Sequence, residues 1–312
     1  MERLNKVVVF TTSCVSIPVI QLLASQNRLA GVVTLSLEDL GDSRLAGDLQ
    51  QLRQQLVQAN IPQVDLNNTR LLAQFDHWQA SAGLVFGFSH KIDAQVCDYF
   101  DGEIFNLHAS DLPAYRGSNP IYWQLCDNLT QTQLTLHRLT EQMDSGEIGL
   151  QAPLAIHPFD NHQSLSLLVM QAAPELVADF ITGYETGAID WRAQQGEVSL
   201  APRVNADNAQ LSWSEHTVAD FIGAARAGNP HHGGVAVHVN GGMFNVMQIT
   251  ASSQPSYGCV PGTVLAVDKE KGLIVAAKDG AVRLDVIVAQ SGYYSGYQFA
   301  VFYQLDAGMI LG

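Results

Sequence analysis

The chain has 312 residues, of which 47% are hydrophobic and 15% charged, and this length allows two domains with separate cores. The net charge of −14 argues against a broad polyphosphate-binding surface, because nucleic-acid affinity depends on Lys and Arg side chains that neutralise phosphates. Without a signal-like N-terminus, about 18 uninterrupted apolar residues or a CxxC pair, the sequence predicts a cytoplasmic protein with no membrane span, metal site or disulfide framework.

Strand-like and helix-like segments alternate over the first two thirds of the chain. Strands are expected at residues 6–12, 29–35, 83–88, 102–108 and 134–139, and helices at 16–25, 48–59, 120–126 and 164–183. This alternation predicts an α/β fold with a Rossmann-like, mostly parallel sheet and helices on both faces. In such sheets, ligands bind beyond the carboxyl ends of the strands.

The sequence pattern changes after residue 188. A stretch rich in Gly, Ala and Gln at 189–206 predicts a linker between a catalytic domain at 1–188 and a C-terminal domain at 207–312. In the C-terminal domain we expect one helix at 213–227 and short strands within 233–250 and 262–289, interrupted by turns such as Asn240-Gly241. Several short strands without intervening helices predict a small OB-like β-barrel.

Three polar residues near the predicted strand 102–108 suggest a site for acyl transfer. Asn106 and His108 lie on one face of that strand by its period of two, and Asp144 follows in a later loop. A histidine can accept the proton of an attacking amine, an aspartate can orient its charged form, and an asparagine amide can donate to the developing oxyanion. No GxSxG, HExxH or HxxEH pattern occurs, which favours direct transfer between two bound substrates. By spacing alone, a structural histidine remains the alternative.

The segment around these residues resembles a known enzyme family. The pattern NLHxSxLPxYRG, then PxxW, then TLHxxxxxxDSGxI, is similar to that of the folate-dependent formyltransferases. The resemblance continues through LSW, PGTV and AKDGAVRL to the terminal GMILG. It implies a formyltransferase that uses 10-formyltetrahydrofolate without a metal, with Asn106, His108 and Asp144 as the catalytic trio.

The resemblance also implies where the folate lies. Its pterin is expected against the loop after strand 83–88 and the loop before Asp144, mostly through backbone groups. The residues concerned are Phe88, His90, Lys91, Ile92, Ser110, Leu112, Pro113, Thr140 and Met143. Asp111 stands where the family has leucine, so its charge either alters folate affinity or points to water.

Arg116, Ser118 and Trp123 are the expected contacts to the acceptor. Arg116 has an equally strong alternative as a residue that stabilises its own loop. Four further histidines at 90, 137, 231 and 232 are expected to be packed or solvated, because no Cys or Asp ligands lie nearby.

Charge decides which acceptor we expect. Methionyl-tRNA formyltransferases of similar length contact tRNA with a basic loop after the second strand, but residues 34–48 hold Glu38, Asp39, Asp42 and Asp48 against Arg44 alone. The linker is neutral, and the C-terminal domain has five Lys or Arg against eight Asp or Glu. A small amine, such as a nucleotide-linked amino sugar, an amino acid or a peptide, is therefore favoured, although Ser118 replaces an arginine of the aminoarabinose-type enzymes.

Several alternatives stay open. The tRNA is not excluded as acceptor, and the chain is expected to be a monomer or a homodimer. A formylfolate hydrolase is disfavoured because Lys6 opens directly into the first strand, which leaves no room for an N-terminal regulatory domain. A non-catalytic folate-binding protein is disfavoured because the whole trio is present.

Overall fold

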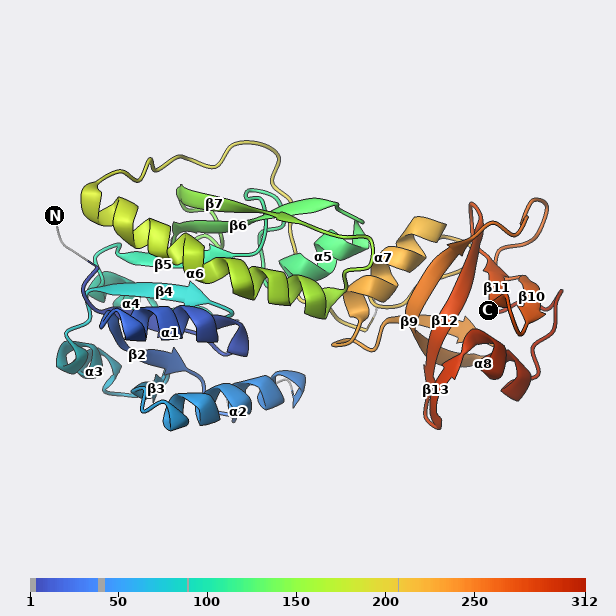
Figure 1. The fold of residues 1–312 in the computed structure, drawn as a ribbon, viewed down its shortest axis with the longest axis horizontal. Helices are drawn as coiled ribbons and strands as arrows, with labels where there is room; N and C mark the ends of the chain where they lie inside the picture. The colour runs from blue at the N-terminus through green and yellow to red at the C-terminus, as the bar shows by residue number, and fades with distance from the viewer. Residues whose placement is uncertain (1–3, 39–42, 89, 207) are drawn as a thin grey trace. The chain divides into compact units, whose positions relative to one another are not determined.

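The computed structural model describes residues 4–38, 43–88, 90–206 and 208–312, and the chain forms two compact units (Figure 1). The first unit comprises Met1–Pro120, Gln131–Ala155 and Ser166–Pro202. The second comprises Ile121–Thr130, Ile156–Leu165 and Arg203–Gly312. Each unit is described by itself below. Because compact units and sequence domains are different divisions of a chain, the limits 1–188, 189–206 and 207–312 stay a prediction.

The first unit contains a seven-stranded sheet with the order β3-β2-β1-β4-β5-β6-β7. Neighbouring strands from β3 to β5 are parallel, whereas β6 and β7 are antiparallel to the strands beside them. The strands are β1 (Val7–Phe10), β2 (Leu29–Thr34), β3 (Gln63–Asp65), β4 (Ala82–Phe86), β5 (Ile104–His108), β6 (Gln131–Arg138) and β7 (Ile148–Ala155). The mostly parallel sheet predicted from the sequence is confirmed.

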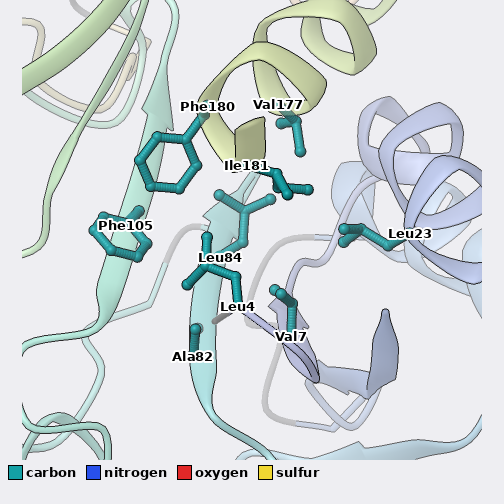
Figure 2. A pocket seen from close by; sticks show the side chains of 10 residues that line it. Leu4, Val7, Leu23, Ala82, Leu84, Phe105, Val177, Phe180 and Ile181 are labelled. Atoms are coloured by element: carbon teal, nitrogen blue, oxygen red, sulfur yellow. The ribbon is translucent and has the colours of Figure 1, made fainter. Parts of the chain in front are cut away.

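Helices cover both faces of this sheet, as the continuous apolar run of β1 requires. They are α1 (Ile17–Ser25), α2 (Ser43–Gln58), α3 (Leu71–Trp78), α4 (Ala94–Tyr99) and α6 (His162–Thr186), with a short 3-10 turn, η1 (Cys14–Ser16), before α1. On one face, Leu84 and Phe105 of the sheet lie beside Phe180 of α6 and Leu23 of α1 (Figure 2). On the other, Phe75 of α3 and Val96 of α4 belong to a core cluster that also contains Val8, Phe10, Val85 and Ile104.

The apolar gap in Figure 2 belongs to the core rather than to a ligand site. Its lining consists of apolar side chains and Gly83, and its volume is only about 10 Å³. That volume is comparable with one water-sized sphere, and an apolar gap of this size offers a water no polar partners. The gap marks imperfect packing between α6 and the sheet.

Helix α6 is long and apolar enough, by length and composition alone, to cross a membrane. A core helix passes the same test. Its residues Val169, Ala173, Leu176, Val177 and Phe180 are buried within the protein. Packing on the sheet therefore accounts for the hydropathy of α6.

The second unit contains an antiparallel sheet with the order β10-β11-β12-β9-β8, in which β13 also pairs with β12. Its elements are α5 (Pro120–Cys126, which starts at the last residue of a first-unit segment), α7 (Val218–Gly228), β8 (Val235–Val239), β9 (Gly242–Ser252), β10 (Val264–Asp268), β11 (Gly272–Ala276), β12 (Ala281–Ala289), β13 (Gly292–Ser295) and α8 (Gly296–Phe302). The expected fold class, an α/β unit followed by a small unit of short antiparallel strands, is confirmed.

The helix expected at 213–227 begins later, at Val218. Thr217 and Asp220 form a reciprocal capping box that fixes this start. Trp213 lies before the helix, and its ring stacks on Phe221 with the ring centroids 4.7 Å apart. The apolar pattern that suggested a longer helix therefore reflects core packing of a turn residue.

Several short elements were not expected from the sequence: β3, α3, α4, β7 and α8. All five have eight or fewer residues, which is too short for a clear periodic signal. The second helix also starts at Ser43, not at Asp48. Of the acidic residues expected after β2, Asp39 and Asp42 lie outside the described residues.

Candidate active site

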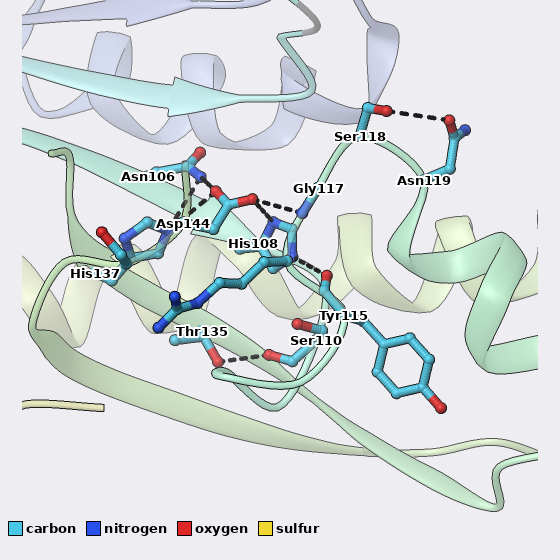
Figure 3. Close-up of polar contacts among 12 residues, drawn as sticks. Asn106, His108, Ser110, Tyr115, Gly117, Ser118, Asn119, Thr135, His137 and Asp144 are labelled. Atoms are coloured by element: carbon cyan, nitrogen blue, oxygen red, sulfur yellow. Dashed lines mark hydrogen bonds and ion pairs between the residues drawn. The ribbon is translucent and has the colours of Figure 1, made fainter. Parts of the chain in front are cut away.

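The candidate site forms on one face of the antiparallel pair β5–β6. Asn106 stands opposite His137 in the strand register, and His108 stands opposite Thr135. Since side chains two residues apart share a face, these four polar groups form a block on the sheet. His108, Thr135 and His137 are buried, as is Asp144, which reaches the block from the loop between β6 and β7 (Figure 3).

Asp144 is the centre of the block (Figure 3). Its Oδ1 accepts a hydrogen bond from Asn106 Nδ2 at 3.1 Å, and its Oδ2 accepts one from the Gly117 amide at 2.8 Å. The Nδ1 atom of His108 lies 3.6 Å from Oδ2, and Nε2 of His137 lies 3.6 Å from Oδ1. The structure therefore brings together Asn106, His108 and Asp144. The side chains of His108 and Asp144 are close enough to act as an acid–base pair.

His108 has a defined tautomer. Its Nε2 lies 2.9 Å from the carbonyl oxygen of Tyr115. A carbonyl only accepts, so Nε2 carries the hydrogen and donates it, and in the neutral ring Nδ1 is the unprotonated nitrogen. Burial lowers the pKa of His108, while Asp144 and the bond to Tyr115 oppose that shift. The ring is thus neutral under ordinary conditions, with its basic nitrogen facing a carboxylate.

Asp144 stays ionised although it is buried. Burial alone would raise its pKa, but the hydrogen bond that the Gly117 amide donates to the carboxylate helps to hold the pKa below its ordinary value. Asp144 also adopts a left-handed backbone conformation, with φ at 51°. That conformation is unfavourable for a residue with a Cβ and costs about 1–2 kcal/mol, so the surrounding contacts have to maintain it.

His137 is the residue that sequence reasoning missed. It was expected to be a packed or solvated histidine, and it is fully buried, but within this polar block. Its Nδ1 donates to the carbonyl of Arg138 at 2.8 Å, which leaves Nε2 to accept from Asn106 Nδ2 at 3.1 Å. The alternation of Thr135 and His137, matching that of Asn106 and His108, was the available signal. Only the strand register makes the two pairs neighbours.

The hydrogen bonds of Asn106 bear on its expected role. Both hydrogens of Nδ2 are in use, one on Asp144 and one on His137. Donation to the oxyanion of a substrate therefore requires one of these two bonds to be exchanged.

The loop at 109–119 carries several predicted folate and acceptor contacts. Ser110 is fully buried, its hydroxyl donates to the carbonyl of Ala114 at 2.7 Å, and its own carbonyl accepts from Thr135 Oγ1 at 2.6 Å. Leu112 and Pro113 are buried as well, so their side chains help to hold the loop. Ser118 is exposed, and its hydroxyl lies 3.4 Å from Asn119 Oδ1 (Figure 3).

The predicted folate residues of the other two loops are partly in the core. Ile92 belongs to the buried cluster with Phe10, and half-buried Phe88 packs edge-on against Phe10 and near the ring of His90. Lys91 is exposed. In the loop before Asp144, the Thr140 hydroxyl donates to the carbonyl of Gln142, and the Met143 side chain is 59% exposed.

Arg116 and Asp111 are held by side chains that were not expected at the site. The Nε and a terminal nitrogen of Arg116 donate to Gln194 Oε1 at 3.1 and 2.6 Å. Asp111 Oδ1 accepts from Gln151 Nε2 at 3.0 Å, and Arg192 donates to the other end of Gln151 at 2.6 Å. The charge of Asp111 is therefore accommodated by a polar chain.

Trp123, the third predicted acceptor contact, lies on α5 in the second unit, where its ring meets Tyr122 edge-on at 5.3 Å. Within the described part of the chain, no group of three or more His, Cys, Asp or Glu side chains is arranged to hold a metal ion.

Comparison with known proteins places these residues in a family context. The model of the formyl transferase family matches residues 5–181, and that of the formyl transferase C-terminal domain matches residues 203–298. Over 98% of both chains, the sequence is 23% identical to a methionyl-tRNA formyltransferase from Syntrophomonas wolfei.

Two solved structures share the fold. An N-formyltransferase from Helicobacter canadensis, in complex with folinic acid and dTDP-3-aminofucose, matches with a TM-score of 0.65 and 15% identity, covering 93% of this chain and 99% of that one. HypX from Aquifex aeolicus, in complex with tetrahydrofolic acid, matches with a TM-score of 0.63 and 12% identity over 96% of this chain. The present chain spans about half the length of HypX, 48%.

Proposed function

Because this chain belongs to the formyl transferase family, we propose that it transfers the formyl group of 10-formyltetrahydrofolate to the amine of a small acceptor in the cytoplasm. The acceptor class is a nucleotide-linked amino sugar, an amino acid or a peptide. The observation that carries this proposal is the buried block in which Asn106 and His108 meet the ionised Asp144.

The residues around the block suit a folate. 10-Formyltetrahydrofolate supplies the reacting carbon as a formyl group on N10. Beside Asp144, Met143 offers an exposed apolar side chain that can lie against a flat ring. Two solved structures with this fold contain a folate: one was determined with tetrahydrofolic acid and the other with folinic acid.

His108 is the proposed general base. When the acceptor nitrogen bonds to the formyl carbon, the amine loses a proton, and His108 Nδ1 is the atom that can take it. Asp144 Oδ2, 3.6 Å away, stabilises the resulting imidazolium. As the bond from the formyl carbon to N10 breaks, His108 returns this proton to N10, so the products are the N-formyl amine and tetrahydrofolate.

Asn106 is the proposed donor to the oxygen of the formyl group. That oxygen gains negative charge during attack, and a fixed amide hydrogen stabilises it. In the structure both Nδ2 hydrogens serve Asp144 and His137, so substrate binding has to displace one of them. His137 is neutral in this bond and is the weaker acceptor, so we assign it as the partner that is released.

The described surface supports a small acceptor. Two cations of the first unit that could contribute to a basic patch are already engaged: Arg28 pairs with Glu185 at 2.8 Å, and Lys6 donates to Asn27. Asp48, after β2, accepts from the amide of Cys14. A tRNA stem needs several phosphate contacts, each supplied by a cation, whereas a small diphosphate needs one or two.

The second candidate function is formylation of methionyl-tRNA. It is favoured by the full-length similarity to methionyl-tRNA formyltransferases, although the identity is only 23%. The net charge of −14 argues against it.

An acceptor screen tests the proposal. The protein is incubated with a donor that carries a ¹³C-formyl group and with, in turn, amino sugars linked to a nucleoside diphosphate, amino acids, short peptides and charged initiator tRNA. We expect the label in the N-formyl product of a small amine, and none with His108→Ala. Label found only in methionyl-tRNA overturns the acceptor class. Label found only in free formate identifies a hydrolase instead.

A further inference from the structure

The segment expected to be a linker contributes to the site. Residues 192–201, which we call the strap, lie in the first unit and are anchored at both ends. At the start, Arg192 and Ile148 exchange backbone hydrogen bonds of 3.0 and 2.8 Å. At the end, Arg116 and the strap pair in the same way, through Ser199 at 2.9 Å and Ala201 at 2.7 Å. The strap is therefore ordered against the loops that carry the catalytic groups.

Gln194 is the residue of the strap that joins these loops. Its Nε2 donates to the carbonyl oxygens of Asp144 at 2.8 Å and Gly146 at 2.9 Å. Its Oε1 accepts two hydrogen bonds from Arg116. The orientation of this amide is fixed, since guanidinium groups only donate and carbonyls only accept. Both donors and the acceptor of the side chain are satisfied within the site.

The carbonyls that Gln194 holds belong to a constrained turn. Asp144 has the left-handed φ of 51°, and a Cβ on Gly146 would lie 1.9 Å from the carbonyl oxygen of Arg138. This turn aims the Asp144 carboxylate at the Gly117 amide and at His108. Two hydrogen bonds from one side chain therefore stabilise the backbone that sets the position of the carboxylate.

The other end of the strap holds the partners of His108 and Asp144. The Ser199 hydroxyl accepts from the amide of Tyr115 at 2.8 Å, and the carbonyl of Tyr115 is the acceptor for His108 Nε2. Gly117, whose amide binds Asp144, has a φ of 132° and lies so close to Ala201 that an added Cβ would be 2.4 Å from its carbonyl oxygen. The side chains of His108 and Asp144 are thus each linked to the strap through one intervening residue, Tyr115 or Gly117.

We propose that Gln194 is a positioning residue, which holds the Asp144 turn and the Arg116 loop in one frame so that Asp144 faces His108. This inference rests on the proposed formyl transfer for its kinetic consequence. Its structural consequence, the placement of Asp144 beside His108, can be measured without turnover.

The test compares Gln194→Met with Gln195→Met, a matched control at the exposed neighbouring position. We expect kcat of Gln194→Met to fall about tenfold to a hundredfold, as for a misplaced catalytic group, with KM for donor and acceptor within about threefold of the wild type. The control should keep the wild-type kcat. Thermal unfolding and circular dichroism establish that both variants are folded.

A second readout follows the ring of His108 by NMR during a pH titration. If Gln194 places Asp144, the pKa of His108 falls in Gln194→Met, because the opposite charge is no longer held beside the ring. It stays unchanged in Gln195→Met. This readout separates the two proposals. A shifted titration in an enzyme without formyl transfer supports the role of Gln194 and rejects the proposed function.

Gln194→Glu covers the case in which the methionine variant does not fold. The carboxylate still pairs with Arg116, but it presents an oxygen instead of two donors to the carbonyls of Asp144 and Gly146. The same loss of kcat is expected. Wild-type kcat and a wild-type His108 titration in either folded variant overturn the proposal.

Discussion

Each of the two units contains a histidine whose pKa is lowered by desolvation, and the neighbours of the two rings have opposite effects. His108 in the first unit loses basicity through burial, but the carboxylate of Asp144 restores part of it. His162 in the second unit is half-buried, and desolvation together with the rings of His231 and His232 lowers its pKa to about 3. The centroids of the His162 and His231 rings are 4.8 Å apart. The comparison shows that desolvation lowers the pKa of both rings, and that the partner then either opposes this shift or adds to it.

The largest expected effect is on kcat, and it distinguishes His108 from His162. His108→Ala and Asp144→Ala should each lower kcat about a hundredfold or more, the loss that removal of a positioned acid–base group causes. His162→Phe should leave kcat within about twofold, because a ring that stays neutral does not move protons. Steady-state kinetics on folded variants decides this. A near-normal rate in His108→Ala would remove that residue from the mechanism.

Substitution of His137 tests how far the second buried histidine of the first unit contributes to stability and turnover. His137→Leu leaves one Asn106 donor buried without its acceptor, which costs about 1–3 kcal/mol of unfolding free energy. We also expect kcat to fall about tenfold, because Asn106 loses its orientation. His137→Gln supplies an acceptor again and should recover part of both losses. Chemical denaturation and kinetics on the pair measure them, and equal losses in the two variants would contradict the assignment of Nε2 as an acceptor.

The pH dependence of stability should reflect both histidines. Their pKa values in the folded protein lie below the ordinary value of 6.5, so between the two values the unfolded chain binds more protons. Stability is therefore present above about pH 6.5 and is lost as the pH falls, by up to about 1.4 kcal/mol per pH unit for each group. For His162 this window extends to about pH 3.

His162→Phe should flatten that acid loss, since phenylalanine fills the space without a proton site. Urea denaturation between pH 7 and pH 4 provides the measurement. An identical slope in wild type and variant means that His162 does not stay neutral in the folded protein.

The smallest effect is expected at Asp111. Its carboxylate is exposed and bonded to Gln151, so Asp111→Leu should change the unfolding free energy by no more than about 0.5 kcal/mol. The KM for the folate donor should stay within about threefold. A larger change in KM, without a change in stability, would place the charge of Asp111 against the folate.

The sequence was sufficient for the sheet and for the convergence of Asn106, His108 and Asp144, whose catalytic role stays a prediction, but not for the contacts that hold them. The β-branched runs such as Val7–Phe10 and the alternation of Asn106 with His108 are local patterns, which the structure keeps. The expected family and fold class are confirmed. Gln194 and His137 could not be assigned, since their roles depend on strand register and on a segment with no periodic pattern. Arg116, expected at the acceptor, is fixed by Gln194, and its contact with substrate stays a prediction.

The most direct test of the central claim, that Asp144 makes His108 the proton acceptor, is an NMR titration of His108 in the wild type and in Asp144→Asn. Asparagine keeps the shape of the side chain and removes its charge, at the loss of one of the two hydrogen bonds that Asn106 and the Gly117 amide donate to the carboxylate. We predict that the pKa of His108 is lower in Asp144→Asn than in the wild type, and that turnover is lost with it. An unchanged titration of His108 would contradict the claim, because Asp144 would then exert no influence on the proton that His108 accepts.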